Sequence, residues 1–200
     1  EVAAKLGVNH IVQHRINRGV AAAFQSGLEA SLAAGADIIV NTDGDNQYPG
    51  SQIPTLIAPI LERRTNIVIG DRQTHQVAHF SGVKKWLQRF GSSVVGFAAG
   101  MPVPDAASGF RALDREAALR IQVMSTYSYS LETIIQAAKK GLRISFVPIE
   151  VNAPTRQSRL IKSNSSYIRR QASTILRVYT VYEPLKTFVA LEQMVQRQGQ

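Results

Sequence analysis

The sequence predicts an α/β fold in which a mostly parallel sheet is flanked by helices. Two observations support this prediction. Short apolar runs at 38–40, 67–69 and 144–151 alternate with longer segments whose apolar residues recur every three or four positions. The composition, 44% hydrophobic and 18% charged over 200 residues, is typical of a compact domain rather than a disordered chain.

The N-terminal elements follow in order. Residues 1–7 resemble the last turns of a helix ended by Gly7, so we expect the protein to start upstream of Glu1. The run 10–14 predicts a short strand. A helix is then predicted from Gly19 to Gly35, since apolar side chains recur four residues apart at Phe24, Leu28 and Leu32.

The central elements are the most regular. The compact run 38–40 predicts a strand covered on both faces. After a turn at 49–50, residues 53–61 carry apolar side chains at i, i+3, i+4, i+7 and i+8, which predicts a helix. The run 67–69 predicts the next strand, and residues 82–99 predict a longer helix with Trp86, Phe90 and Val94 four apart.

The C-terminal elements begin with a short helix capped by Asp114 and ending at Ile121. A second helix, capped by Ser130, is predicted to stop at Gly141. The run 144–151 predicts a strand, and Pro148, which has no N–H to donate, indicates either an edge position or a bulge.

The chain ends in a different kind of segment. Residues 164–182 predict a basic amphipathic helix with tyrosines, suited either to a membrane interface or to packing on its own domain. We therefore expect a catalytic domain over 1–163 and a helical, membrane-interfacial tail over 164–200.

Composition and charge exclude several classes of function. Without cysteine the chain has no disulfide scaffold, Cys-ligated zinc site or thiol nucleophile. Neither a secretory signal nor an apolar run of membrane-spanning length is evident. The net charge is +9, and the segment 139–177 alone contributes +8. Such a region attracts phosphates. A nucleic-acid-binding function is disfavoured because no aromatic stacking platform accompanies the basic residues.

An acidic motif directly follows a predicted strand. Asp43 and Asp45 come after the apolar run 38–40, at the carboxyl end of the strand, where ligands bind in open α/β sheets. Two nearby carboxylates repel each other unless a cation lies beside them, and hard oxygen ligands favour Mg²⁺ or Mn²⁺. Because Asp-Gly-Asp also occurs in simple turns, the motif by itself leaves both interpretations open.

Several motifs, taken in order, are more specific. The run 36–48 resembles the Asp-x-Asp strand end of family 2 inverting glycosyltransferases, in the branch of dolichyl-phosphate mannose synthase and the bacterial polyprenyl-phosphate glycosyltransferases. The family's other motifs have counterparts, in order, in Asn17-Arg18-Gly19, in Val68 to Arg72, in Asp105 to Arg111, in Tyr129 to Glu132, and in Val147-Pro148-Ile149 with Arg156. The resemblance covers about residues 1–165 and implies the GT-A-like nucleotide-binding fold of that family.

The resemblance also implies roles for individual residues. Asp43, Asp45 and Gln47 would hold a Mg or Mn cation and the donor diphosphate, with Arg156 also contacting the diphosphate. Asp45 and Arg156 would be the catalytic residues. Arg72, Arg89 and Ser93 would bind the acceptor phosphate. Ser108 to Arg111 are expected to shape a loop that closes the site.

We therefore expect metal-dependent, inverting transfer of a sugar from a nucleotide diphosphate sugar to a polyprenyl phosphate at the cytoplasmic face of a membrane. The protein would be peripheral, or anchored by segments outside this sequence. One alternative is transfer to a saccharide hydroxyl, which needs a base, with Asp105 or Glu132 as candidates. Another is an inactive, truncated homologue, since the family's opening strand and its nucleobase-binding aspartate have no counterpart here. The sequence leaves the oligomeric state open.

Overall fold

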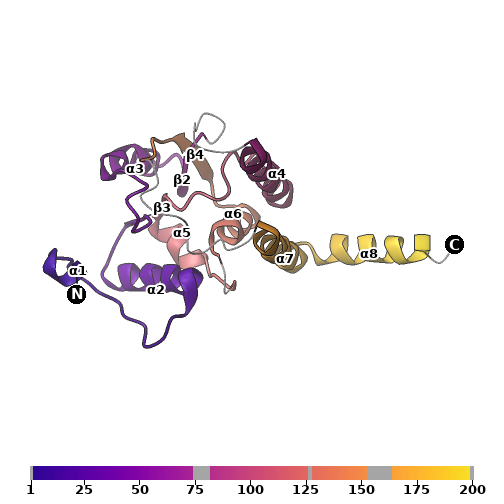
Figure 1. The fold of residues 1–200 in the computed structure, drawn as a ribbon, viewed down its shortest axis with the longest axis horizontal. Coiled ribbons are helices and arrows are strands. Elements are labelled where there is room, and N and C mark those ends of the chain that lie inside the picture. Colours follow the sequence, from indigo (N-terminus) through magenta and orange to yellow (C-terminus); the bar gives the residue numbers. More distant parts are fainter. Residues whose placement is uncertain (1, 74–81, 126–127, 153–163, 199–200) are drawn as a thin grey trace.

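The structure, a computed structural model, describes residues 2–73, 82–125, 128–152 and 164–198. Figure 1 shows a small sheet surrounded by helices, with the last helix projecting from the body. The elements, in chain order, are α1 Val2–Lys5, α2 Gly19–Ala33, β1 Ile38–Asn41, the 3₁₀ turn η1 Gly50–Gln52, α3 Ile53–Leu61, β2 Ile67–Asp71, α4 Gly82–Ala99, β3 Arg111–Asp114, α5 Arg115–Arg120, α6 Ser130–Lys139, β4 Ile144–Pro148, α7 Asn164–Tyr182 and α8 Pro184–Gln198.

The sheet has the strand order β1-β3-β2-β4. Strands β1, β2 and β4 point the same way, as the predicted parallel sheet requires, but β3 lies between β1 and β2 and pairs antiparallel with both. Strand β3 was not predicted, because its four residues include Arg111 and Asp114 and lack a continuous apolar run. Strand β4 is an edge strand, which is one of the two alternatives that Pro148 indicated.

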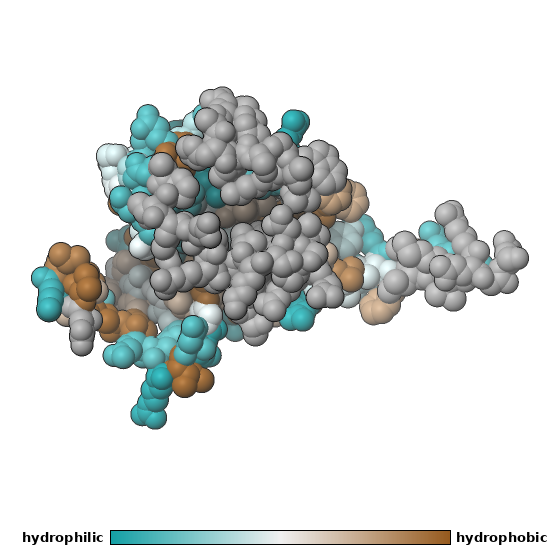
Figure 2. Space-filling view, viewed as in Figure 1, coloured by the Kyte–Doolittle hydropathy of each residue, from teal (hydrophilic) through white to brown (hydrophobic). Residues whose placement is uncertain are grey.

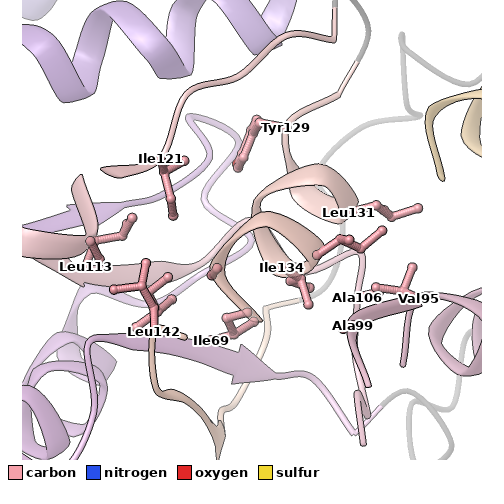
Figure 3. Packing of buried hydrophobic residues seen from close by; sticks show 14 of the residues in the cluster. Ile69, Val95, Ala99, Ala106, Leu113, Ile121, Tyr129, Leu131, Ile134 and Leu142 are labelled. Carbon is pink, nitrogen blue, oxygen red and sulfur yellow. The ribbon is translucent and has the colours of Figure 1, made fainter. Parts of the chain in front are cut away.

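Alternation along the strands builds two hydrophobic cores. In β2, Ile67 and Ile69 face one side of the sheet and Val68 faces the other. The first side is covered by α2, α4, α5, α6 and α7, and the second by α3. Figure 3 shows Ile134 and Leu131 of α6 between the sheet and the α4 residues Val95 and Ala99. Burying each such aliphatic side chain contributes roughly 1.5–3 kcal/mol.

The predicted strand at 10–14 is wrong. This segment forms no strand, and Ile11 and Val12 are each more than half exposed. Exposed apolar side chains of the N-terminal segment are visible at the left of Figure 2. The physical reason is that, among the described residues, no strand pairs with this segment, and an isolated extended segment cannot satisfy its own backbone.

Helix boundaries follow local chemistry. The Asn17 side chain accepts a hydrogen bond from the Gly19 N–H (2.9 Å), and Gly19 has a φ of +84°, so the chain enters α2 through a conformation that favours glycine. Asp114 caps α5 by accepting from the Ala117 N–H (2.7 Å), as predicted. The predicted cap at Ser130 is wrong by one residue: Tyr129 is the N-cap residue, and its side chain makes no capping hydrogen bond.

The C-terminal helices differ in how they pack. Ile175, Val178, Tyr179 and Tyr182 of α7 pack against the main core, so the tyrosine-bearing face of this helix is turned towards the protein. An ion pair between Lys139 of α6 and Glu183 (2.6 Å) lies at the start of α8. Beyond it, α8 extends away from the body (Figure 1). Within the described part of the chain, no helix is both long and apolar enough to cross a membrane.

Candidate active site

Most of the predicted site residues lie at the end of the sheet where the parallel strands β1 and β2 finish, here called the site edge. Asp43 and Asp45 follow β1, and Arg72 follows β2. Because β3 is antiparallel, the loop 105–110 that precedes it meets the same edge. Residues 149–152 arrive there after β4. The antiparallel insertion thus supplies a loop that a purely parallel sheet would have placed at the opposite edge.

Residues 43–47 form the acidic loop, and their own side chains shape it. Asp45 Oδ1 accepts a hydrogen bond from the Gln47 N–H (3.1 Å), and Asn46 between them has a φ of +60°. Burial raises the pKa of Asp43, and the negative charge of Asp45 raises it further, while Arg72 and Arg111 oppose the shift. The two carboxylates therefore repel each other at a partly desolvated position.

Gly109 lies against the Asp43 carboxylate. A Cβ atom at residue 109 would stand 2.8 Å from Asp43 Oδ2, closer than van der Waals contact allows. The Gly109 peptide is held from both sides: its N–H donates to the Tyr48 hydroxyl (3.2 Å), and its carbonyl accepts from Asn41 Nδ2 (2.7 Å). The loop 105–110 is therefore fixed against the acidic pair.

Tyr129 and Arg111 support this arrangement from inside the core. The Tyr129 hydroxyl accepts from Asn41 Nδ2 (2.8 Å), and its ring stacks on Phe24. Arg111 is 2% exposed and donates to the carbonyls of Ser108 and Ser130 (both 2.8 Å) and of Ala106 (3.1 Å), and to the Thr133 hydroxyl (2.6 Å). Burial lowers the pKa of Arg111. This guanidinium joins the loop 105–110 to the start of α6.

Arg72 and Asp105 form a buried ion pair. The Arg72 guanidinium donates through Nε (2.7 Å) and Nη2 (2.8 Å) to the two carboxylate oxygens of Asp105. Their side chains are 9% and 3% exposed. The Asp105 carboxylate also accepts from the backbone N–H groups of Arg72 and Ala107. This fork geometry is the strong form of a carboxylate–guanidinium contact.

Glu132 binds the backbone of residues 124–125 rather than the loop 105–110. It is 1% exposed and accepts from the backbone N–H groups of Met124 (2.8 Å) and Ser125 (2.9 Å) and from the Gln136 side chain (3.0 Å). These contacts hold the chain that enters α6. Both acids considered as a base for a hydroxyl acceptor, Asp105 and Glu132, therefore have structural partners.

The remaining predicted residues lie on α4, which contacts the loop 105–110 through the hydrogen bond from the Ala106 N–H to the Ser92 hydroxyl, or outside the described residues. Arg89 and Ser93 lie one turn apart on α4 with exposed side chains, and the Ser93 hydroxyl donates to the Arg89 carbonyl. Arg156 lies outside the described residues. Asn152, four positions earlier, donates from its backbone and side chain to the carbonyls of Gln47 and Asn46 (2.9 and 2.8 Å), so the chain leading to Arg156 starts at the acidic loop.

A divalent cation suits the acidic loop. Asp43 and Asp45 supply hard oxygen ligands whose mutual repulsion a cation would relieve, and Gln47 adds a side-chain carbonyl next to them. Among the described residues, no group of three or more His, Cys, Asp or Glu side chains is placed to hold a metal. The donor set therefore fits an ion that shares its coordination with phosphate oxygens and water, as Mg²⁺ and Mn²⁺ do.

A cavity of about 560 Å³ lies elsewhere, between the segment 10–14 and α2, where His14 Nε2 is 2.9 Å from the Ser26 hydroxyl. It contains none of the predicted site residues. Four residues that shape the candidate site had no predicted role: Asn41, Tyr48, Tyr129 and Asn152. Asn41 and Tyr48 lie within the run 36–48 and Tyr129 begins the motif 129–132, whereas Asn152 stands in no motif.

The sheet presents a carboxylate pair, two arginines with buried side chains and a close-packed glycine where its parallel strands end, which is the place where open α/β sheets bind their ligands. Comparison with known families identifies the class of protein. Residues 1–121 match the model of glycosyl transferase family 2. The chain belongs to this family of transferases.

Three proteins are similar to this chain over most of its length. An uncharacterised protein of Methanocaldococcus jannaschii is 31% identical over 75% of this chain and 63% of its own length. The UDP-N-acetylglucosamine–dolichyl-phosphate N-acetylglucosaminyltransferase of Methanococcus voltae is 32% identical over 70% of this chain and 57% of its own. The undecaprenyl-phosphate mannosyltransferase of Micrococcus luteus is 25% identical over 70% and 59%. The chain thus spans about 60% of the length of these relatives.

A solved structure shares the fold. Glucosyl-3-phosphoglycerate synthase from Mycobacterium tuberculosis, crystallised with Mn²⁺, UDP and glucosyl-3-phosphoglycerate, superposes with a TM-score of 0.56. It is 20% identical, and the match covers 84% of this chain and 56% of that protein. The expected GT-A-like fold class is confirmed by this similarity.

Proposed function

We propose that this chain carries the catalytic domain of a metal-dependent inverting glycosyltransferase. Its donor would be a nucleotide diphosphate sugar and its acceptor a polyprenyl phosphate at the cytoplasmic face of a membrane. Relatives named for dolichyl phosphate and undecaprenyl phosphate support the acceptor. A neighbour crystallised with Mn²⁺ and UDP supports the cation and the donor.

The observation that carries the acceptor proposal is the engagement of both candidate bases. Asp105 is bound by Arg72, and Glu132 is buried among backbone N–H groups. A hydroxyl acceptor must lose a proton as it attacks, whereas a phosphate is already anionic near neutral pH. A site without a free base among these acids therefore favours a phosphate acceptor over a saccharide hydroxyl.

The reaction follows from this choice. An acceptor phosphate oxygen attacks the anomeric carbon, the bond from that carbon to the donor diphosphate breaks, and the nucleoside diphosphate leaves with the electron pair, which inverts the configuration. Asp43, Asp45 and Gln47 would hold the cation, which neutralises the leaving diphosphate, and Arg156 would contact the same group. Catalysis then rests on positioning and charge stabilisation.

We propose that Arg89 and Ser93 on α4 receive the acceptor phosphate, with Arg72 adding positive charge at the site edge. Guanidinium groups bind phosphate oxygens in bidentate fashion. Arg72 itself is bound to Asp105, and removing one partner of a buried ion pair typically costs 3–5 kcal/mol. Arg89 is exposed, so its substitution tests acceptor binding without that loss of stability.

The decisive assay compares polyprenyl phosphate, unphosphorylated polyprenol and saccharide acceptors, with and without Mn²⁺ or Mg²⁺. We expect turnover only with the phosphate and the cation, and a loss of at least about 100-fold in Asp45→Ala. Arg89→Ala should raise the KM for polyprenyl phosphate, whereas the exposed Arg15→Ala should leave it unchanged. Preference for a saccharide hydroxyl would contradict the proposed phosphate acceptor and support transfer to a saccharide instead.

A further inference from the structure

Asn152 is fastened to the acidic loop by two hydrogen bonds. Its backbone N–H donates to the carbonyl of Gln47 (2.9 Å), and its side-chain Nδ2 donates to the carbonyl of Asn46 (2.8 Å). These carbonyls belong to consecutive residues, so a single residue from another part of the chain holds the whole peptide turn from outside. The residues involved are 105 or more positions apart in the sequence.

The held turn contributes to the direction of the predicted ligands. The Gln47 N–H donates to Asp45 Oδ1, so the orientation of this peptide contributes to where the Asp45 carboxylate points. Asn46 has a φ of +60°, a left-handed conformation that asparagine adopts more readily than most other residues except glycine. The two hydrogen bonds from Asn152 reinforce this local preference from outside the turn.

The support behind Asn152 is rigid. Ile149 donates its N–H to the Asp71 carbonyl (3.0 Å) and is 6% exposed. Its side chain packs so closely on Gly70 that a Cβ there would lie 2.6 Å from Ile149 Cδ1. Val151 joins the same hydrophobic cluster. The segment 149–152 is thus anchored to β2 and the second core before it reaches the acidic loop.

We propose that Asn152 is a positioning residue for donor binding. It fixes the Asn46–Gln47 turn so that Asp45 and Gln47 face the cation and the diphosphate. The proposal rests on the proposed function, since it assigns Asn152 to the same donor site. It predicts that Asn152 acts through Asp45 and Gln47 without touching the substrate.

The test measures binding as well as turnover in the intact protein. Mn²⁺ binding is followed by electron paramagnetic resonance, and Mn²⁺-dependent binding of UDP and of GDP by calorimetry. In Asn152→Ala we expect about fivefold weaker binding of Mn²⁺ and of the nucleotide that the wild type binds, a raised donor KM and a nearly unchanged kcat. Hydrogen exchange in residues 43–48 should become faster. Asn152→Gln, which retains an amide donor, should recover part of the affinity.

A matched control is available at the opposite edge of the sheet. Asn66 also makes side-chain hydrogen bonds across elements, donating to Asp114 Oδ2 (2.8 Å) and accepting from the Arg143 N–H (3.0 Å). Asn66→Ala should lower thermal stability at least as much as Asn152→Ala while leaving Mn²⁺ and nucleotide binding unchanged. Equal losses of affinity in the two variants would show a merely structural role and overturn the proposal.

The outcomes separate this inference from the proposed function. A wild-type protein that binds neither nucleotide in the presence of Mn²⁺ contradicts both. A wild-type protein that binds one of them, together with an Asn152→Ala variant of equal affinity, contradicts the role of Asn152 alone.

Discussion

At the scale of single residues, the position of Asp43 depends on the lack of a side chain at Gly109. Gly109 leaves space in which the Asp43 carboxylate lies directly against the backbone. Asn41 and Tyr48 bind the carbonyl and the N–H of the same glycine. The position of Asp43 is therefore defined by a glycine and two neutral side chains.

Gly109→Ala should displace the Asp43 carboxylate, because the new methyl group would stand 2.8 Å from Oδ2. We expect Mn²⁺ affinity to fall about tenfold or more, since a metal ligand displaced by several tenths of an ångström no longer fits the small coordination sphere. Calorimetric titration with Mn²⁺ measures the effect.

Gly27→Ala provides the matched control. Gly27 lies within α2, and a Cβ there meets no atom within 4 Å. This substitution should leave Mn²⁺ affinity intact and stabilise the fold by about 0.5–1 kcal/mol, because alanine has the higher helix propensity. Unchanged Mn²⁺ binding in Gly109→Ala would show that Asp43 is not a ligand in its present orientation.

At the scale of elements, the two C-terminal helices play different roles. Helix α7 packs Tyr179 and Tyr182 on the core, so these tyrosines are not placed for a lipid surface. Helix α8 exposes apolar side chains instead, with Leu185 77% and Phe188 63% exposed on one face beside the exposed Lys186. Hydrogen bonds from Lys139 and Lys186 lower the pKa of Glu183 at the junction of the two helices.

We expect α8 to contact the membrane surface, since a helix that exposes apolar side chains on one face can bury that face among the lipid headgroups. Replacing Leu185 and Phe188 together by serine should weaken binding to vesicles of anionic phospholipid by about tenfold or more. Cosedimentation with vesicles measures this. Leu119→Ser, which removes a 63% exposed leucine from α5, should bind like wild type. Equal binding by all three proteins would exclude α8 as the contact.

At the scale of the whole molecule, a network of polar groups runs from the site into the core. Asn41 of β1 joins Gly109 to Tyr129, and Arg111 of β3 joins the loop 105–110 to α6. Burial raises the pKa of Tyr129 to about 12. The stability of the fold therefore depends on whether the buried Tyr129 hydroxyl is protonated.

This dependence predicts alkaline unfolding. Because the folded-state pKa of Tyr129 lies above the ordinary value of 10.0, its stabilisation is complete below pH 10 and is lost as the pH rises through about 12. The loss is on the order of 2 kcal/mol. Tyr129→Phe should be about 1 kcal/mol less stable at pH 7, where it lacks the Asn41 hydrogen bond, but should lack this alkaline loss. Denaturant unfolding from pH 7 to 12 should show the wild type start above Tyr129→Phe and fall below it near pH 12, because the loss of about 2 kcal/mol exceeds the initial difference of about 1 kcal/mol; parallel curves would contradict the assignment.

The sequence by itself determined the elements whose cause is local. The spacing of Ile53, Leu56 and Ile60 predicts α3, and the apolar runs at 38–40 and 67–69 predict β1 and β2, because burial of one face imposes the helical or extended period. It also placed Asp43 and Asp45 at a strand end, since that needs only the order of residues along the chain.

Only the tertiary structure decided how distant segments meet. It inserted β3 between β1 and β2, paired Arg72 with Asp105, set Gly109 against Asp43, and brought Asn152 to Asn46. Each of these contacts joins residues 33 to 106 positions apart in the sequence. Each depends on packing that exists only after the strands have assembled into the sheet. Periodicity records which face of an element is buried, but not which loop lies opposite it, because that depends on the order of the strands.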